Sequence, residues 1–182
     1  HIWASKVGSL ESPDWCVIDL DPKEAPFSDV VRTAIAVRKL CETIGMPSYV
    51  KTTGKTGLHV YVPIMRHYPY HLVRKACETI GHFISSAMPG KLSLDWSVPK
   101  RTGKIFFDHN QNVRGKTLAA PYSLRPTAFA SVSVPIGWDE LATVYPTDFT
   151  IATVPDRLAK HGDPWSGIME HKHDLRPLLE GA

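Results

Sequence analysis

Cysteine is scarce in this sequence, and its spacing excludes two kinds of small scaffold. The 182 residues contain three cysteines, Cys16, Cys41 and Cys77, with no CxxC arrangement. An odd number of widely spaced thiols predicts neither a disulfide framework nor a thiolate zinc site. We therefore expect a protein of a reducing compartment, the cytoplasm, that folds around an apolar core.

Long apolar runs are also missing, and the charge is nearly balanced. No run approaches the roughly 18 residues that span a membrane, and no basic and apolar leader opens the chain, so we expect no membrane partner. The formal net charge of +3 fits a polyanionic partner without requiring one. Hydrophobic residues make up 43% of the chain, which is enough for the core of a single domain.

The hydrophobic pattern predicts helices interleaved with strands, and therefore an α+β fold with helices packed on a mixed or largely antiparallel sheet. His59 and Tyr61 are expected on the face of their strand opposite to its apolar residues. The expected strands are 15–20, 49–53 and 58–64 as a hairpin, and 104–108, with further extended runs at 116–122 and 128–134. The expected helices are 29–44, 69–88, a short one at 138–141 and one at 155–161.

The first strand ends in VIDLDP, which places two carboxylates, Asp19 and Asp21, side by side on one face. Like charges that close repel each other unless a cation lies between them, and Mg²⁺ or Mn²⁺ prefers such oxygens. Two other interpretations stay open at this point. The pair is also compatible with a solvated strand end before Pro22, or with a phosphotransferase in which the first aspartate is a covalent nucleophile.

Two Gly-Lys-Thr tripeptides, residues 54–56 and 115–117, invite comparison with a P-loop. That motif needs a glycine five residues before the Gly-Lys pair, whereas positions 49 and 110 hold Tyr and Asn. Neither tripeptide is therefore a Walker A loop. Each is either a plain polar turn or a turn whose N–H groups and ammonium cradle a phosphate.

A polar and basic segment between residues 100 and 125 surrounds a single carboxylate. This composition suits a site that holds both a metal ion and a triphosphate, although a charged hairpin with an ordinary ion pair is the alternative. The segment contains Lys100, Arg101, Lys104, Asp108, Asn110, Gln111, Asn112, Arg114, Lys116 and Arg125.

Taken together, these motifs resemble the archaeo-eukaryotic primase superfamily, and within it the polymerase domain of bacterial DNA ligase D and its stand-alone relatives. The similar segments are VIDLDP, KTTGKTGLHVYVPI, RTGKIFFDHNQNVRGKTLAAPYSLR and SVSVPIGWDEL. They occur in the family's order and spread over most of the chain, which is far more specific than any one of them alone.

The resemblance implies a set of site residues. Asp19, Asp21 and Asp108 are similar in position to the family's acidic residues, which implies that they are catalytic and bind two metal ions, Mn²⁺ or Mg²⁺. The remaining positions imply nucleotide binding by Thr53, Lys55, Thr56, His59, Arg101, Gln111, Lys116 and Arg125. His1 is similar to a histidine that precedes the acidic pair in the family.

The resemblance also implies a function and partners. We expect a primase-like catalytic core over residues 1–182 that lacks an N-terminal portion common in the family, where the pocket for a DNA 5′-phosphate lies. The implied activity is metal-dependent extension of a primer on a DNA template with NTPs or dNTPs, in non-homologous end joining. The implied partners are the nucleotide, primer-template or broken-end DNA, a DNA ligase and an end-binding protein. A non-catalytic nucleic-acid-binding module and an aspartate-dependent phosphatase remain as alternatives.

Overall fold

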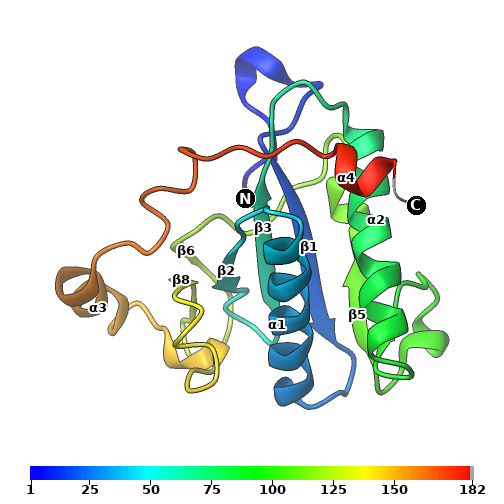
Figure 1. The fold of residues 1–182 in the computed structure, drawn as a ribbon. Coiled ribbons are helices and arrows are strands. Elements are labelled where there is room, and N and C mark those ends of the chain that lie inside the picture. The colour runs from blue at the N-terminus through cyan, green and yellow to red at the C-terminus, as the bar shows by residue number, and fades with distance from the viewer. Residues whose placement is uncertain (181–182) are drawn as a thin grey trace.

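A six-stranded mixed sheet forms the centre of the fold in the computed structural model, which describes residues 1–180 (Figure 1). Its strand order is β4-β5-β1-β3-β2-β8, and all neighbours are antiparallel except β4 and β5. The strands of this sheet are β1 Trp15–Pro22, β2 Tyr49–Thr52, β3 Leu58–Pro63, β4 Leu92–Ser93, β5 Ile105–Asp108 and β8 Pro135–Ile136. β1 is therefore central, with β5 on one side and β3 on the other.

Two long helices cover one face of this sheet (Figure 1). α1 Phe27–Thr43 buries residues that recur every three or four positions, from Val30 to Cys41, and α2 Tyr70–Ala87 does the same from Val73 to Ile84. The remaining helices are α3 Val154–His161 and α4 Arg176–Leu179, with short 3-10 turns η1 Val7–Ser9, η2 Val98–Arg101, η3 His109–Asn112 and η4 Pro146–Asp148.

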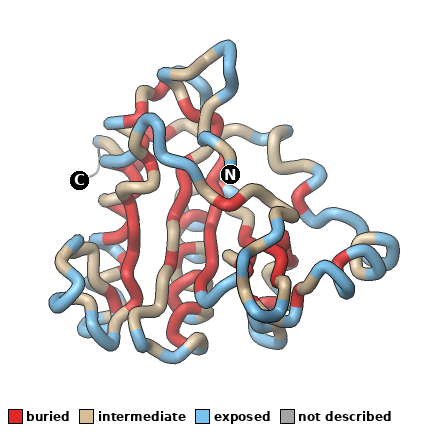
Figure 2. Tube along the Cα trace, turned by 180° about the vertical axis from the view of Figure 1, so that it is seen from behind, coloured by how far each residue is buried: buried red, intermediate tan, exposed pale blue. Residues whose placement is uncertain are grey.

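Side-chain alternation along β1 separates the two faces of the sheet. Cys16, Ile18 and Leu20 point toward the helices and are almost fully buried in the main core. Val17 points to the other face, where it packs with Tyr61 and Trp165 in a small second cluster. Figure 2 shows the buried residues following the central strands. The helix-free face therefore carries apolar side chains at one end of β1 and the aspartates at the other.

Most of the expected elements are confirmed. The hairpin is formed by β2 and β3, and the long helices lie within one or two residues of their predicted limits. β1 is longer than predicted because Asp21 and Pro22 still pair with β5. The prediction of a short helix at 138–141 is wrong, because these residues form turns. Of the expected extended run 128–134, only β7 Val132–Ser133 is a strand, and it pairs with β6 Ser123–Leu124.

None of the helices within residues 1–180 is both long and apolar enough to cross a bilayer.

Candidate active site

The open face of the sheet brings the two predicted acidic segments together. Asp19 lies directly opposite His59 of β3 on one side and opposite Asp108 of β5 on the other. Directly opposed residues of antiparallel strands share a face, so the three side chains project from the same surface. Residues nearly 90 positions apart in the sequence thus meet at the centre of the sheet.

Gln111 links the two facing carboxylates. Its Nε2 donates a hydrogen bond of 3.1 Å to Asp108 Oδ2 and lies 3.5 Å from Asp19 Oδ2. Asp108 Oδ1 accepts a 2.9 Å bond from the backbone N–H of Asn110, which fixes the start of η3. Burial, together with the negative charge of Asp19, raises the pKa of Asp108 to about 6. The pair therefore carries a repulsion that a cation would relieve.

The donor set fits a hard divalent cation, with Asp21 in a different position from the other two. Carboxylate oxygens that face each other are the ligands Mg²⁺ and Mn²⁺ prefer. Asp21 Oδ2 instead lies 2.7 Å from Lys23 Nζ. Within residues 1–180, no three His, Cys, Asp or Glu side chains gather into a metal site. Asp19 and Asp108 are thus the ligands brought together here, and a site with all three aspartates stays a prediction.

His59 lies against Asp19 in a buried environment. Its Nε2 is 3.4 Å from Asp19 Oδ1, and its Nδ1 is buried without a hydrogen-bond partner among the described residues. Burial lowers the pKa of His59 below its usual value, and the charge of Lys51 acts in the same direction. The imidazole is therefore neutral at pH 7 and contacts Asp19 as a polar rather than a cationic group.

Lys51 is an ionisable residue of the site that the sequence analysis did not single out. Its side chain is fully buried, and its Nζ hydrogen-bonds to the hydroxyl of Ser133 and lies 3.5 Å from the carbonyl of Thr52. Burial, followed by the charge of Arg125, lowers the pKa of Lys51 to about 7. The available signal was the hairpin register, because Lys51 lies opposite His59 and so shares its face.

The first Gly-Lys-Thr turn connects β2 to β3 beside Asp19 and Asp21. The hydroxyl of Thr53 accepts hydrogen bonds from the N–H groups of Lys55 and Gly57, at 3.2 and 3.1 Å. A Cβ at Gly54 would lie 2.6 Å from a carbon of Arg125, and Gly54 has a φ of +70°. Glycine is therefore required for the turn to pack closely against Arg125.

A cavity of about 250 Å³ lies beside this turn and gathers most of the predicted site residues. Arg125 lies 3.4 Å from His1, measured between Nη1 and Nε2. Thr117 of the second Gly-Lys-Thr tripeptide also lines the cavity, together with Leu118 and Ala119, which the sequence did not predict. The predicted residues in its lining are His1, Asp19, Asp21, Thr53, Lys55, Thr56, His59, Gln111 and Arg125.

Arg101 and Lys116 lie elsewhere. The structure places both against Trp96, next to β5, and neither lines the cavity. Their predicted role as ligands of the nucleotide phosphates therefore has no geometric support from the cavity.

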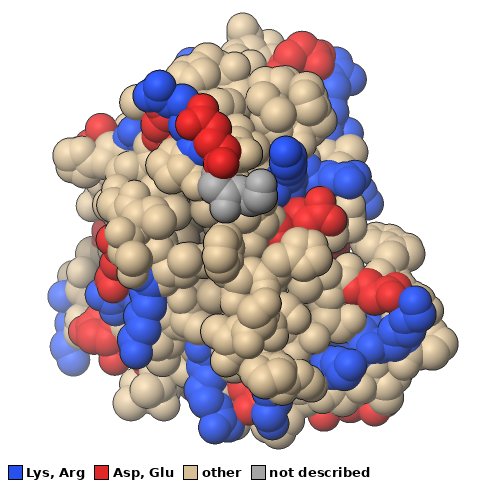
Figure 3. All heavy atoms as spheres, turned by 45° about the vertical axis from the view of Figure 1, so that its right-hand side comes forward, with Lys and Arg blue, Asp and Glu red and all other residues tan. Residues whose placement is uncertain are grey.

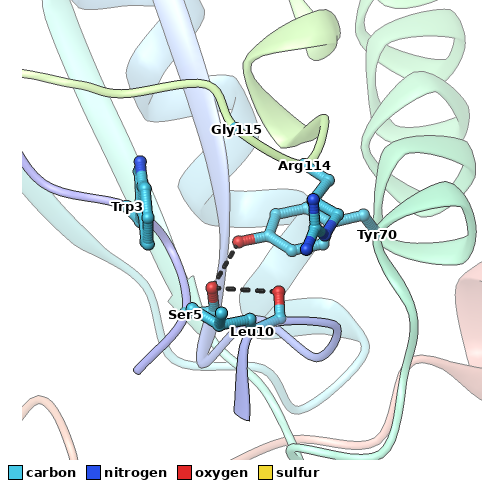
Figure 4. A pocket seen from close by; sticks show the side chains of 6 residues that line it. All are labelled: Trp3, Ser5, Leu10, Tyr70, Arg114 and Gly115. Carbon is cyan, nitrogen blue, oxygen red and sulfur yellow. Dashed lines mark hydrogen bonds between the residues drawn. The ribbon is translucent and has the colours of Figure 1, made fainter. Parts of the chain in front are cut away.

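A smaller hollow lies where the N-terminal segment packs against α2 (Figure 4). It measures about 50 Å³ and lies between Trp3, Leu10, Tyr70 and Arg114. The hydroxyl of Tyr70 donates a 2.8 Å bond to Ser5, whose hydroxyl donates to the carbonyl of Leu10 at 3.3 Å. These bonds fasten the N-terminal segment to α2, and the space is small for a nucleotide.

The side of the molecule that carries α2 and α4 shows cationic and anionic side chains interspersed (Figure 3). Several of the charges are paired, as in Lys91 with Asp29 and Arg176 with Asp174. Charge therefore does not distinguish this side as a surface for a polyanion.

Paired carboxylates beside a cavity with lysine and arginine, on the open face of an α+β sheet, are typical of nucleotidyltransferases that use divalent metals. The chain belongs to the LigD primase-polymerase domain family, whose family model matches residues 1–165.

Individual relatives agree with this assignment. The chain is 31% identical over 170 residues to the multifunctional non-homologous end joining protein LigD of Pseudomonas aeruginosa, and 31% identical over 165 residues to the bifunctional LigD of Bacillus subtilis. These matches cover 91% and 89% of this chain but only 20% and 27% of the relatives. The polymerase domain of Mycobacterium tuberculosis ligase D, solved in complex with DNA, has a TM-score of 0.81 and 28% identity, over 89% of this chain and 57% of that one.

These findings confirm the resemblance stated from the sequence, the α+β primase-like fold and an enzyme of the primase-polymerase class. The chain spans about a quarter or less of the length of the two curated relatives. The activity, substrates and partners of this protein are therefore proposals.

Proposed function

We propose that this chain extends a primer on a DNA template with nucleoside triphosphates, in a metal-dependent reaction that serves non-homologous end joining. The observation that carries the proposal is the meeting of Asp19 and Asp108, bridged by Gln111, beside the cavity of the Gly-Lys-Thr turn. The relatives' names support the repair role, and the DNA in the solved ligase D complex supports the template.

The acidic residues hold the metal in this proposal. Asp19 and Asp108 would bind Mn²⁺ or Mg²⁺, and Asp21 would join them after leaving Lys23. Held by these residues, a divalent ion would lower the pKa of the primer 3′-hydroxyl and neutralise charge on the leaving pyrophosphate. The neutral imidazole of His59 keeps the Asp19 carboxylate oriented and does not neutralise the negative charge that binds the metal ion.

The cavity holds the incoming nucleotide. Lys55 and Arg125 supply charge-assisted hydrogen bonds to the phosphates, and the Thr53–Gly57 turn packs close enough to Arg125 to form one wall with it. Both NTPs and dNTPs are proposed as substrates. A DNA ligase and an end-binding protein are proposed partners, because the relatives combine end-joining functions in one protein.

Primer extension by an Asp108→Ala variant tests the proposal. Labelled primer-template, nucleotides and Mn²⁺ should give extension with the unchanged protein and at least about a thousandfold less with the variant, since several kcal/mol of charge stabilisation is lost. Asp156→Ala is the matched control, because Asp156 is exposed on α3 and should retain full extension.

The same assay separates the alternatives. Full extension by Asp108→Ala would contradict the proposed metal site. DNA binding without extension by the unchanged protein would support a binding module. Release of inorganic phosphate with a phosphorylated Asp19 would support a phosphatase.

A further inference from the structure

An exposed tryptophan lies next to the acidic site. Trp96, in the loop between β4 and η2, leaves 60% of its surface exposed. Its ring centroid is 6.0 Å from that of Phe106 on β5, in an edge-to-face arrangement with 71° between the planes. Neighbouring Val98 is equally exposed. An exposed aromatic patch of this kind is typical of a binding surface.

Two cations lie against this aromatic pair. The guanidinium carbon of Arg101 is 4.0 Å from the centroid of Phe106 and 5.9 Å from that of Trp96, and Lys116 Nζ is 5.8 Å from the centroid of Trp96. None of the ion pairs formed within residues 1–180 includes Arg101 or Lys116. Their charge therefore remains available to an anionic partner.

The loop that carries Trp96 is held in place by its own contacts. The Asp95 side chain accepts a 2.9 Å bond from the N–H of Ser97 and lies 2.8 Å from Lys100 Nζ. The backbone N–H of Lys100 donates to the carbonyl of Ser97, which starts η2. The ring is thus presented on an ordered loop, which reduces the entropy lost when a partner stacks on it.

The sheet topology defines which side of the site this surface occupies. Phe106 lies directly opposite Asp21 in the pairing of β1 with β5. The Gly-Lys-Thr turn and His59 of β3 line the nucleotide cavity from the other side of β1, and Gln111, which follows β5, also reaches its lining. The Trp96 and Phe106 rings therefore lie on the β5 side of Asp21, whereas the Gly-Lys-Thr turn of the cavity lies on the β3 side. In-line displacement needs the attacking hydroxyl and the leaving group on opposite sides of the phosphorus.

We propose that Trp96 stacks on an unpaired base of the DNA strand that enters the site, while Arg101 and Lys116 bind the phosphates that flank this base. The inference rests on the proposed polymerase function and deepens it. Stacking aromatics combined with cations are the usual means of holding single-stranded nucleic acid without sequence preference. The two cations thereby serve the DNA strand instead of the incoming nucleotide.

A single-stranded oligonucleotide that contains one 2-aminopurine tests this assignment. Stacking on Trp96 should quench the 2-aminopurine fluorescence, and Trp96→Ala should remove this quenching and weaken binding about tenfold or more at fixed salt. Trp96→Phe should keep most of the affinity because a flat ring remains. Phe83→Ala, which removes another half-exposed aromatic from α2, should bind like the unchanged protein.

Nucleotide binding, measured by titration with Mn²⁺ present, completes the experiment. It should be unchanged in Trp96→Ala, which also shows that this variant is folded. Unchanged oligonucleotide affinity in Trp96→Ala would overturn the stacking role, and an equal loss of nucleotide affinity would overturn the assignment to the DNA strand. Neither readout requires primer extension, so a failure here is distinct from a failure of the proposed catalysis.

Discussion

The two faces of the central sheet differ in what their side chains do. On the helix-covered face, Ile18 and Leu20 are fully buried among aliphatic residues of both long helices. On the open face, Asp19 and Asp21 alternate with them, and Asp19 faces both Asp108 and His59. Adjacent residues of one strand therefore serve stability and chemistry separately, because the side-chain period of a strand is two.

The open face is itself divided along β1. Val17 is covered by Tyr61 and Trp165, whose indole N–H donates to the carbonyl of Val50 at 3.1 Å. Two residues further on, the face carries the carboxylate of Asp19 next to the cavity. The covered end anchors the polar end, so the carboxylates project from a rigid strand.

Ile18→Ala should produce the largest change in stability. Truncating a fully buried side chain leaves a cavity between sheet and helices, and we expect a loss of about 2–5 kcal/mol in the free energy of unfolding. Urea denaturation measures this quantity. Asp19→Asn, one residue away on the other face, is the matched control and should show no loss of stability while losing extension. A similar loss of stability in both variants would refute the division of labour between the faces.

Asp108→Asn should stabilise the metal-free protein at pH 7 by about 1–3 kcal/mol, because it removes a buried charge facing Asp19. The folded pKa of Asp108, about 6, lies above its ordinary value of 3.8. Asp108 thus holds its proton more tightly in the folded than in the unfolded protein. Its stabilising contribution to the free energy of unfolding is present below pH 4 and is lost as the pH rises through 6.

Denaturation curves with EDTA, measured between pH 4 and 7, check the sign of this effect. The stability advantage of Asp108→Asn over the unchanged protein should grow as the pH rises from about 4 to about 6 and level off above it. An advantage that stays constant over this range would show that Asp108 does not titrate there.

Arg125→Ala should have the smallest of these effects, a change in the free energy of nucleotide binding, and should leave the packing of the main core unchanged. Losing one charge-assisted contact should raise the nucleotide dissociation constant about tenfold, and Arg125→Lys should restore part of the affinity. Calorimetric titration with Mn²⁺ and nucleotide measures this constant. An unchanged dissociation constant would remove Arg125 from the nucleotide site.

Sequence periodicity was enough to predict the long helices, the hairpin and the face on which His59 lies. These features depend on residues close together in the chain. The turns at 138–141 were mistaken for a helix because a few apolar residues at helical spacing do not show whether hydrogen bonds continue between turns. The acidic site residues were predicted from the order of the motifs along the chain, which identifies the residues but does not give the distances between their side chains.

The sequence by itself determined the alternation that separates apolar from acidic side chains on β1, and the glycine at position 54 that the tight turn requires. Only the tertiary structure decided that Asp108 faces Asp19, that Lys51 is buried beside His59, and that Arg101 and Lys116 gather around Trp96. Local steric rules act between neighbours in the chain, whereas strand order and register depend on which distant segments bury their apolar faces together.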